Sequence, residues 1–209
     1  HRETDQGNYI DVAQERAELL AEELVTRGKE WFQYIEQLLS KEQRQTYAFG
    51  RRLAEKGLDP QEFLAAALSA LKAVSRGERN VSLIAGFFSA VPRPTVTATL
   101  DQIAKDEELQ SEILELTRLS RPTSEDLNRL LLLLQKGRLR TDAFGTFAFN
   151  SVLDHLGVAE VLQFAQRLAE HGLEAKVPAF YVLYMYCLHK EERWLACQNL
   201  IKGLVEEEG

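Results

Sequence analysis

Apolar residues recur at every third or fourth position along most of the chain, and this spacing is the pattern of amphipathic α-helices. In the first part of the chain Ala17, Leu20 and Leu24 follow it, and it continues past Gly28. Residues 1–40 are therefore expected to form a long N-terminal amphipathic helical region. Applied to the whole sequence, the pattern predicts an all-α protein with about ten or eleven helices.

Capping residues predict where several helices begin and end. Asp59 is expected to cap a helix that begins at Pro60, because proline suits the first helical position. Thr123 or Ser124, followed by two acidic residues and closed by Gly137, predicts a second well-bounded helix. The loops between the predicted helices are short, which favours antiparallel packing of consecutive helices.

Two segments with less regular patterns are also predicted to be helical. Residues 141–157, TDAFGTFAFNSVLDHLG, continue the alternation of helices and short loops. Residues 179–188, AFYVLYMYCL, are strand-like in composition. They form a long run that is closely flanked by helices, which favours a helix here as well.

Two segments resemble each other: FGRRLAEKGL begins at Phe49 and FAQRLAEHGL begins at Phe164. In both, the Phe and the Leu four residues later share one helix face, and a Gly ends the helix. Their spacing suits repeats of about 35–45 residues, the size of HEAT units. The alternative is a chance similarity between common helix-forming residues. Repeats predict one continuous domain over residues 1–209, an irregular HEAT-like α-solenoid of stacked antiparallel helical pairs.

A longer stretch suggests a family. Residues 116–156, LTRLSRPTSEDLNRLLLLLQKGRLRTDAFGTFAFNSVLDHL, with YVLYMYCL after them, resemble the degenerate HEAT-like α-solenoid regions of large multidomain bacterial proteins. Some of those proteins, including STAND-type NTPases, act in defence against phage. The resemblance covers roughly residues 95–190 and rests on pattern without a diagnostic motif. It implies a sensing or docking module within a longer chain, and it transfers no catalytic residue.

Composition and charge narrow the class of partner. The 209 residues are 45% hydrophobic and 27% charged, which suffices for a core without disulfides or metal. The net charge of −7 disfavours nucleic acid and anionic membranes as partners, and no apolar run is long enough to cross a bilayer. The two cysteines predict reduced thiols and a cytoplasmic protein. Because the chain begins with His1 and not Met, we expect it to be a fragment of a longer protein.

No pattern typical of catalysis is present in the sequence. It has neither a phosphate-binding glycine loop nor a His-Glu-x-x-His motif, so we expect no catalytic residue, no cofactor and no metal. The enzyme alternative is an all-α domain in which Cys187 acts with His189 and an acid. Cys187 lies in an apolar run, however, which favours a buried structural thiol.

A basic set is the first candidate for partner binding. Lys136, Arg138 and Arg140 follow the end of a predicted helix. Cations at this place complement the negative end of a helix, and the alternative is contact with an acidic partner.

Aromatic residues are the second candidate. Phe144 and Phe147 are expected to share a helix face from which Phe149 is turned away. Tyr181 and Tyr184 likewise share a face, and Tyr186 points elsewhere. These rings are expected either in the core or, for the tyrosines, as exposed anchors for a partner.

Together these features predict a non-catalytic protein-interaction, sensor or scaffold module of a larger bacterial protein. Its partner is expected to be a protein, a peptide or another domain of the parent chain. The alternative is a structural oligomerisation unit that pairs through its first helix or through the five leucines 130–134.

Overall fold

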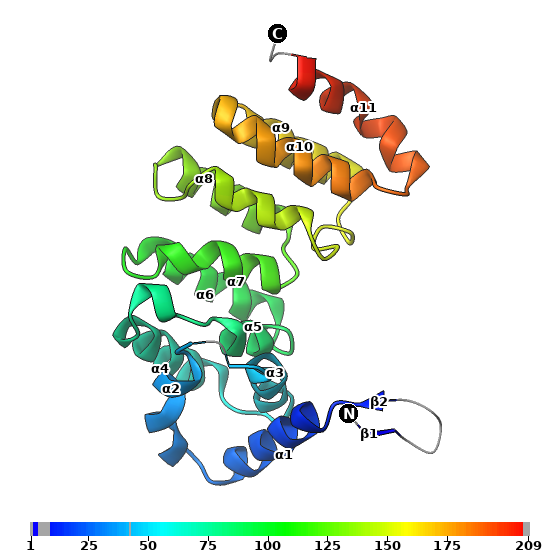
Figure 1. Cartoon of the computed structure of the whole chain (residues 1–209). Helices are drawn as coiled ribbons and strands as arrows, with labels where there is room; N and C mark the ends of the chain where they lie inside the picture. Colours follow the sequence, from blue (N-terminus) through cyan, green and yellow to red (C-terminus); the bar gives the residue numbers. More distant parts are fainter. Residues whose placement is uncertain (1, 4–8, 42, 207–209) are drawn as a thin grey trace. The chain divides into compact units, whose positions relative to one another are not determined.

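The computed structural model describes residues 2–3, 9–41 and 43–206, and within them the chain is all-helical apart from two short strands and one isolated bridge (Figure 1). The strands β1 (Arg2–Glu3) and β2 (Tyr9–Ile10) pair antiparallel. The predicted all-α class is confirmed. Contacts divide the chain into two compact units, residues 1–103 (unit 1) and 104–209 (unit 2).

The helices of unit 1 are α1 (Val12–Thr26), the 3₁₀ helix η1 (Glu30–Tyr34), α2 (Ile35–Leu38), α3 (Thr46–Glu55), α4 (Pro60–Ala73), the 3₁₀ helix η2 (Arg76–Glu78), α5 (Ser82–Phe88) and α6 (Arg93–Lys105), whose last two residues belong to unit 2. The helices that follow in unit 2 are the 3₁₀ helix η3 (Gln110–Glu112), α7 (Ile113–Leu119), α8 (Ser124–Gln135), the 3₁₀ helix η4 (Asp142–Ala148), α9 (Val158–Ala169), α10 (Leu173–Cys187) and α11 (Glu191–Glu206).

The capping predictions are confirmed at the starts of α4 and α8. The Glu62 amide donates to the Asp59 carboxylate at 2.8 Å, and Pro60 is the first residue of α4. At α8 the cap is Thr123, and Asp126 completes a capping box by accepting from the Thr123 amide at 2.8 Å. The residues 179–188, for which a strand was the alternative, are helical from their first residue to Cys187.

Two expected helical segments are shorter or looser than predicted. Of the helical region expected over residues 1–40, residues 1 and 4–8 lie outside the described residues, β1 and β2 are strands, and α1 begins only at Val12. The helix is interrupted after Thr26, where Gly28 adopts a φ of +77°, and continues only as the short elements η1 and α2. Residues 141–157 form η4 and turns but no α-helix, and Asn150 and Ser151 both have positive φ. A left-handed backbone at two successive residues is incompatible with a continuing α-helix.

The core of unit 1 is built around a close crossing of α3 and α5. A Cβ atom on Gly50 of α3 would lie 2.1 Å from the Leu83 carbonyl oxygen, and one on Gly86 of α5 would lie 1.9 Å from the Tyr47 carbonyl oxygen. Because no real Cβ atom tolerates such a distance, the two backbones approach as closely as they do only because both positions are glycine. Aromatic rings fill the space beside this crossing, with Phe87 of α5 4.3 Å from Phe63 of α4 between ring centroids.

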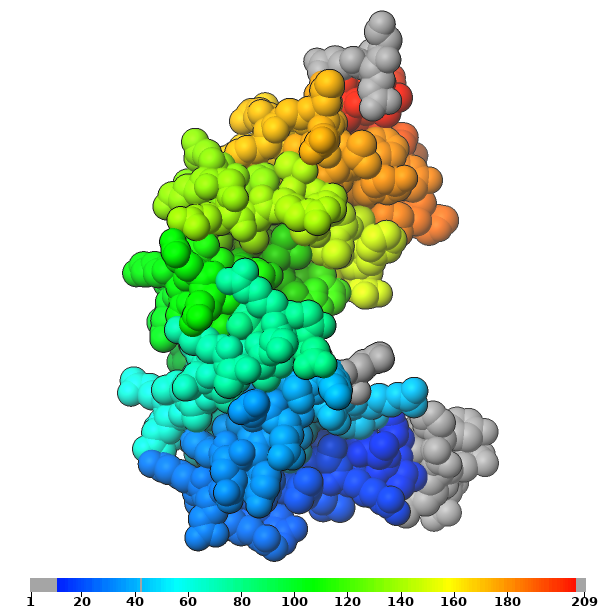
Figure 2. Space-filling model, turned by 60° about the vertical axis from the view of Figure 1, so that its left-hand side comes forward, coloured from blue at the N-terminus to red at the C-terminus, as the bar shows by residue number. Residues whose placement is uncertain are grey.

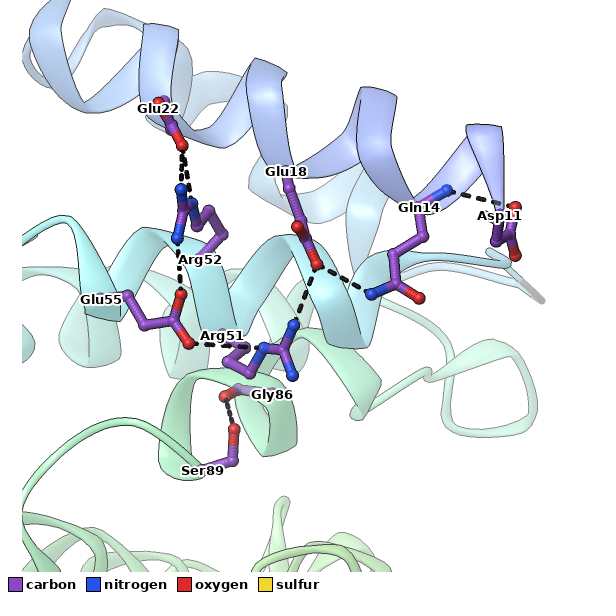
Figure 3. Close-up of polar contacts among 9 residues, drawn as sticks. All are labelled: Asp11, Gln14, Glu18, Glu22, Arg51, Arg52, Glu55, Gly86 and Ser89. Atoms are coloured by element: carbon purple, nitrogen blue, oxygen red, sulfur yellow. Dashed lines mark hydrogen bonds and ion pairs between the residues drawn. The ribbon is translucent and has the colours of Figure 1, made fainter. Parts of the chain in front are cut away.

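Helix α1 is attached to α3 chiefly by charged side chains (Figure 3). Arg51 donates to Glu18 at 2.9 Å, and Arg52 donates from its Nε to Glu22 at 2.8 Å. Of the residues of α1, only Ala21 is fully buried. Leu19 and Leu20 of α1 are exposed and contribute little to its attachment.

In unit 2, α10 occupies the centre of the packing. It contacts η4, α9 and α11, and α11 also contacts α9 (Figure 1). The five leucines 130–134 of α8 lie inside the unit except for Leu132, which is exposed. Burial within the chain therefore accounts for four of the five leucines in this run.

None of the described helices combines the length and the apolar character that a membrane span requires.

The glycine crossing predicts a large difference between two Gly→Ala substitutions. Gly86→Ala should lower the free energy of unfolding of unit 1 by about 3 kcal/mol or more, since α3 and α5 must separate to admit the methyl group. Gly203→Ala is the control: this helical position has nothing within 4 Å of the added atom, and alanine should be neutral or stabilising by about 0.5–1 kcal/mol. Urea unfolding followed by circular dichroism measures both, and equal effects would contradict the close crossing.

Candidate functional site

Helix α10 is apolar on two opposite faces, of which only one is buried. The buried face contains Ala175, Ala179, Val182, Leu183 and Tyr186. The other contains Leu173, Val177, Tyr181 and Tyr184, which are 69%, 50%, 49% and 38% exposed. Their spacing of four, four and three residues places these four side chains in one row along the helix. We call this row the α10 stripe.

Aromatic rings extend the C-terminal end of the α10 stripe. Phe180 stacks on Tyr184 with ring centroids 5.8 Å apart and meets the edge of Tyr181 at 5.6 Å. Beyond Tyr184 lies a shallow hollow of about 430 Å³, which is also lined by Trp194 of α11. Figure 2 shows residues 170–195, in shades of orange, as part of the outer surface of unit 2.

Arg193, the residue before Trp194, belongs to a polar cluster around Asp154. The Asp154 carboxylate accepts from Lys190 at 2.6 Å and from Arg193 at 2.7 Å. Arg193 also donates to the Asp154 carbonyl at 3.0 Å, and its guanidinium lies 3.9 Å from the centre of the Tyr186 ring. The Tyr186 hydroxyl donates to the Leu156 carbonyl at 2.8 Å. The cluster thus joins the loop before α9 to the end of α10 and the start of α11.

Two groups of this cluster have shifted pKa values. Partial burial works against ionisation of Asp154, but the hydrogen bonds from Lys190 and Arg193 outweigh it and hold the pKa of that carboxyl below its ordinary value. Burial raises the pKa of Tyr186, although the charge of Arg193 works in the opposite direction. At neutral pH the cluster therefore consists of one carboxylate, two cations and a neutral phenol.

Cys187 and His189 line the same hollow as Trp194, which is the arrangement that the enzyme alternative requires. Cys187, however, is only 1% exposed, and burial, assisted by the adjacent Cys197 thiol, raises its pKa to about 12. A thiol with this pKa is protonated at neutral pH and is a poor nucleophile. Both cysteines are free and buried, as expected of structural thiols.

The basic set follows α8 on the surface of unit 2. Lys136 is the C-cap residue of α8, and Arg138 donates to Glu107 at 3.1 Å. Arg140 donates to Asp142 at 3.0 Å, and this hydrogen bond lowers the pKa of Asp142. All three cations are exposed. Arg138 and Arg140 thus already have carboxylate partners within the chain. Contact of this set with an acidic partner stays a prediction.

The predicted division of the aromatic residues between faces agrees with the structure. Phe144 and Phe147 are buried and Phe149 is exposed. Tyr181 and Tyr184 are both exposed, whereas Tyr186 is 5% exposed and faces the core. The sequence left open whether Tyr181 and Tyr184 lie in the core or on the surface, and the structure places both on the surface.

Sequence reasoning missed the other members of the site. Leu173 and Val177 continue the row of Tyr181 and Tyr184 backward by whole helical turns, so the helical period alone was enough to find them. Asp154 gave no such signal, because its hydrogen bonds with Lys190 and Arg193 join segments that are 36 and 39 residues apart. Trp194 lies on the next helix, so the spacing along α10 does not place it.

The described residues contain no group of three or more His, Cys, Asp or Glu side chains arranged to hold a metal ion. The arrangement at α10 is therefore one of apolar and aromatic contact, with tyrosine hydroxyls as its polar part. No family model, curated protein or solved structure matches the chain.

The Asp154 cluster predicts a pH-dependent contribution to stability. Asp154→Asn should lower the unfolding free energy of unit 2 by about 1 kcal/mol at neutral pH, the range of a partly exposed ion pair with charged hydrogen bonds. Because the folded pKa is depressed, this contribution is present above the unfolded value of about 4 and is lost as the pH falls through the folded value. The gap between wild type and variant should therefore close in acid.

Urea unfolding from neutral pH down to about pH 3 measures this gap. Glu170→Gln, at an exposed carboxylate after α9, is the matched control and should follow the wild type at every pH. A gap for Asp154→Asn that is independent of pH would contradict the role assigned to its charge.

Proposed function

We propose that the chain is a non-catalytic protein-interaction module of a larger, multidomain bacterial protein, and that it binds a protein or peptide through the α10 stripe and Trp194. The α10 stripe is the observation on which the proposal rests. Folded proteins seldom expose a continuous apolar row on a helix whose opposite face already serves the core. Tyrosine and tryptophan, which dominate this surface, are the residues that contribute most to binding energy at protein interfaces.

The polar surroundings suit a binding surface better than a catalytic one. The pKa shift of Cys187 favours a protonated thiol, and the shift of Asp154 favours an ionised carboxylate held by two cations. The protonated Cys187 thiol is a poor nucleophile, and the Asp154 carboxylate is already occupied by hydrogen bonds from Lys190 and Arg193. The cluster is suited instead to hold α11, and Trp194 with it, in one position.

The HEAT-like solenoid belongs to the same proposal. It is supported by side-chain hydrogen bonds between elements that recur at sequence separations of 30 to 39 residues in both units. In a stack of helical pairs each repeat contacts its neighbours, so contacts accumulate at about one repeat length. A cytoplasmic location fits the two free thiols.

A photo-crosslinker tests the binding surface directly. We expect p-benzoylphenylalanine in place of Tyr181 to give a defined adduct in cells that express the parent protein, and Val177→Asp in the same chain to abolish it, because a carboxylate interrupts the apolar row. The crosslinker in place of Tyr47, an exposed tyrosine of unit 1, is the matched control.

The outcomes separate the candidate functions. An adduct with another protein at Tyr181 but not at Tyr47 supports the interaction module. An adduct between two copies of the chain, retained by the purified protein, supports the oligomerisation unit instead. The same adducts at both positions, or none at either, would remove the α10 stripe as the binding surface.

A further inference from the structure

The hollow at the C-terminal end of the α10 stripe differs in chemistry from the stripe itself. It combines the rings of Tyr184 and Trp194 with the carboxylate of Glu191, and its volume is about 430 Å³. Tyr184 and Trp194 are 38% and 41% exposed, and Glu191 is exposed as well. Phe180 stacks on Tyr184 and holds its ring in place. All three lining groups are therefore accessible to a partner.

Glu191 is the one carboxylate among the described lining residues, and no cation of the described chain pairs with it. Lys190 also lines the hollow, but its ammonium donates to Asp154 at 2.6 Å. Asp154 lines a neighbouring hollow of about 270 Å³ and not this one. Lys190 therefore contributes its alkyl stem to the hollow of Tyr184 and Trp194, and its charge to the Asp154 cluster.

Two aromatic rings beside an unpaired carboxylate are suited to recognise an organic cation. The ring faces of tryptophan and tyrosine attract a positively charged group, and a carboxylate accepts charged hydrogen bonds from it. The chain itself contains such a contact one residue before Trp194, where the Arg193 guanidinium lies 3.9 Å from the centre of the Tyr186 ring. That guanidinium is held by Asp154 and does not line the hollow.

We infer that the hollow binds an arginine side chain of the protein or peptide that covers the α10 stripe. A planar guanidinium can stack on a ring and pair with a carboxylate at the same time, which an ammonium does less well. The inference rests on the proposed function, because the arginine belongs to the partner. It adds that the partner carries a positive charge next to the apolar side chains that contact Tyr181 and Val177.

The first test uses the full chain and N-acetylarginine amide as the probe, with N-acetylcitrulline amide as its neutral isostere. The chain has two tryptophans, so Trp194→Phe identifies the Trp194 indole signal in a ¹H–¹⁵N NMR spectrum. We expect this signal to shift saturably with the arginine derivative, and the citrulline derivative to bind at least about fivefold more weakly. Equal affinities, or no saturable shift with the arginine derivative, would overturn the inference.

Two adjacent glutamates provide a matched pair of variants. Glu191 and Glu192 begin α11, where both carboxylates complement the positive end of the helix, but only Glu191 lines the hollow. Glu191→Gln should weaken the arginine probe about fivefold, and Glu192→Gln should leave its affinity within about twofold. Equal losses from the two substitutions would contradict a direct contact between Glu191 and the guanidinium.

The photo-crosslinker at Tyr181 then tests the inference in cells that express the parent protein. Glu191→Lys should reduce the adduct with the partner at least about fivefold, because an ammonium then faces the partner's arginine, and Glu192→Lys should change it less than about twofold. An adduct that survives Glu191→Lys unchanged would remove the inference and leave the proposed function standing. Absence of the adduct without either substitution would remove both.

Discussion

The approach of α3 to α5 is the constraint on which the rest of unit 1 depends. Two main-chain oxygens occupy the space that side chains at Gly50 and Gly86 would need. This contact leaves no freedom in the spacing of the two helices, and it fixes α3 as the reference element for everything placed against it. Arg51 and Arg52, which attach α1, both lie on α3, so the position of α1 depends on a helix that the glycines hold against α5.

The two similar segments found in the sequence have the same local structure. Each contains the end of a helix and, as its next-to-last residue, a glycine at positive φ, +83° for Gly57 and +112° for Gly172. The arginine at the equivalent position of each segment reaches back to an earlier helix, Arg52 to Glu22 and Arg167 to Asn128. The two segments therefore agree both in their residues and in the contact of this arginine with an earlier helix. A chance similarity between helix-forming residues would not lead one to expect the second agreement.

Local chemistry was predictable from the sequence, and contacts between distant segments were not. Asp59, Thr123 and the tyrosines of α10 act through neighbours within about one helical turn, where spacing alone determines geometry. The loss of the helix expected over residues 141–157 and the interruption at Gly28 depend on backbone conformations that several residue types tolerate. The cluster around Asp154 depends on contacts with Lys190 and Arg193, 36 and 39 residues further along the chain, and no local pattern specifies them.

The helices of unit 1 are held together by two kinds of interaction: α3, α4 and α5 by apolar packing, and α1 by ion pairs with α3. Apolar burial at α3, α4 and α5 responds to temperature and denaturant, whereas exposed ion pairs respond to dissolved salt. Because Ala21 is the one fully buried residue of α1, we expect the free energy of local opening of α1 to lie well below that of the core. Its amide protons should then exchange with solvent faster than those of α3. We therefore expect α1 to open locally without global unfolding, and to do so more often as the ionic strength rises.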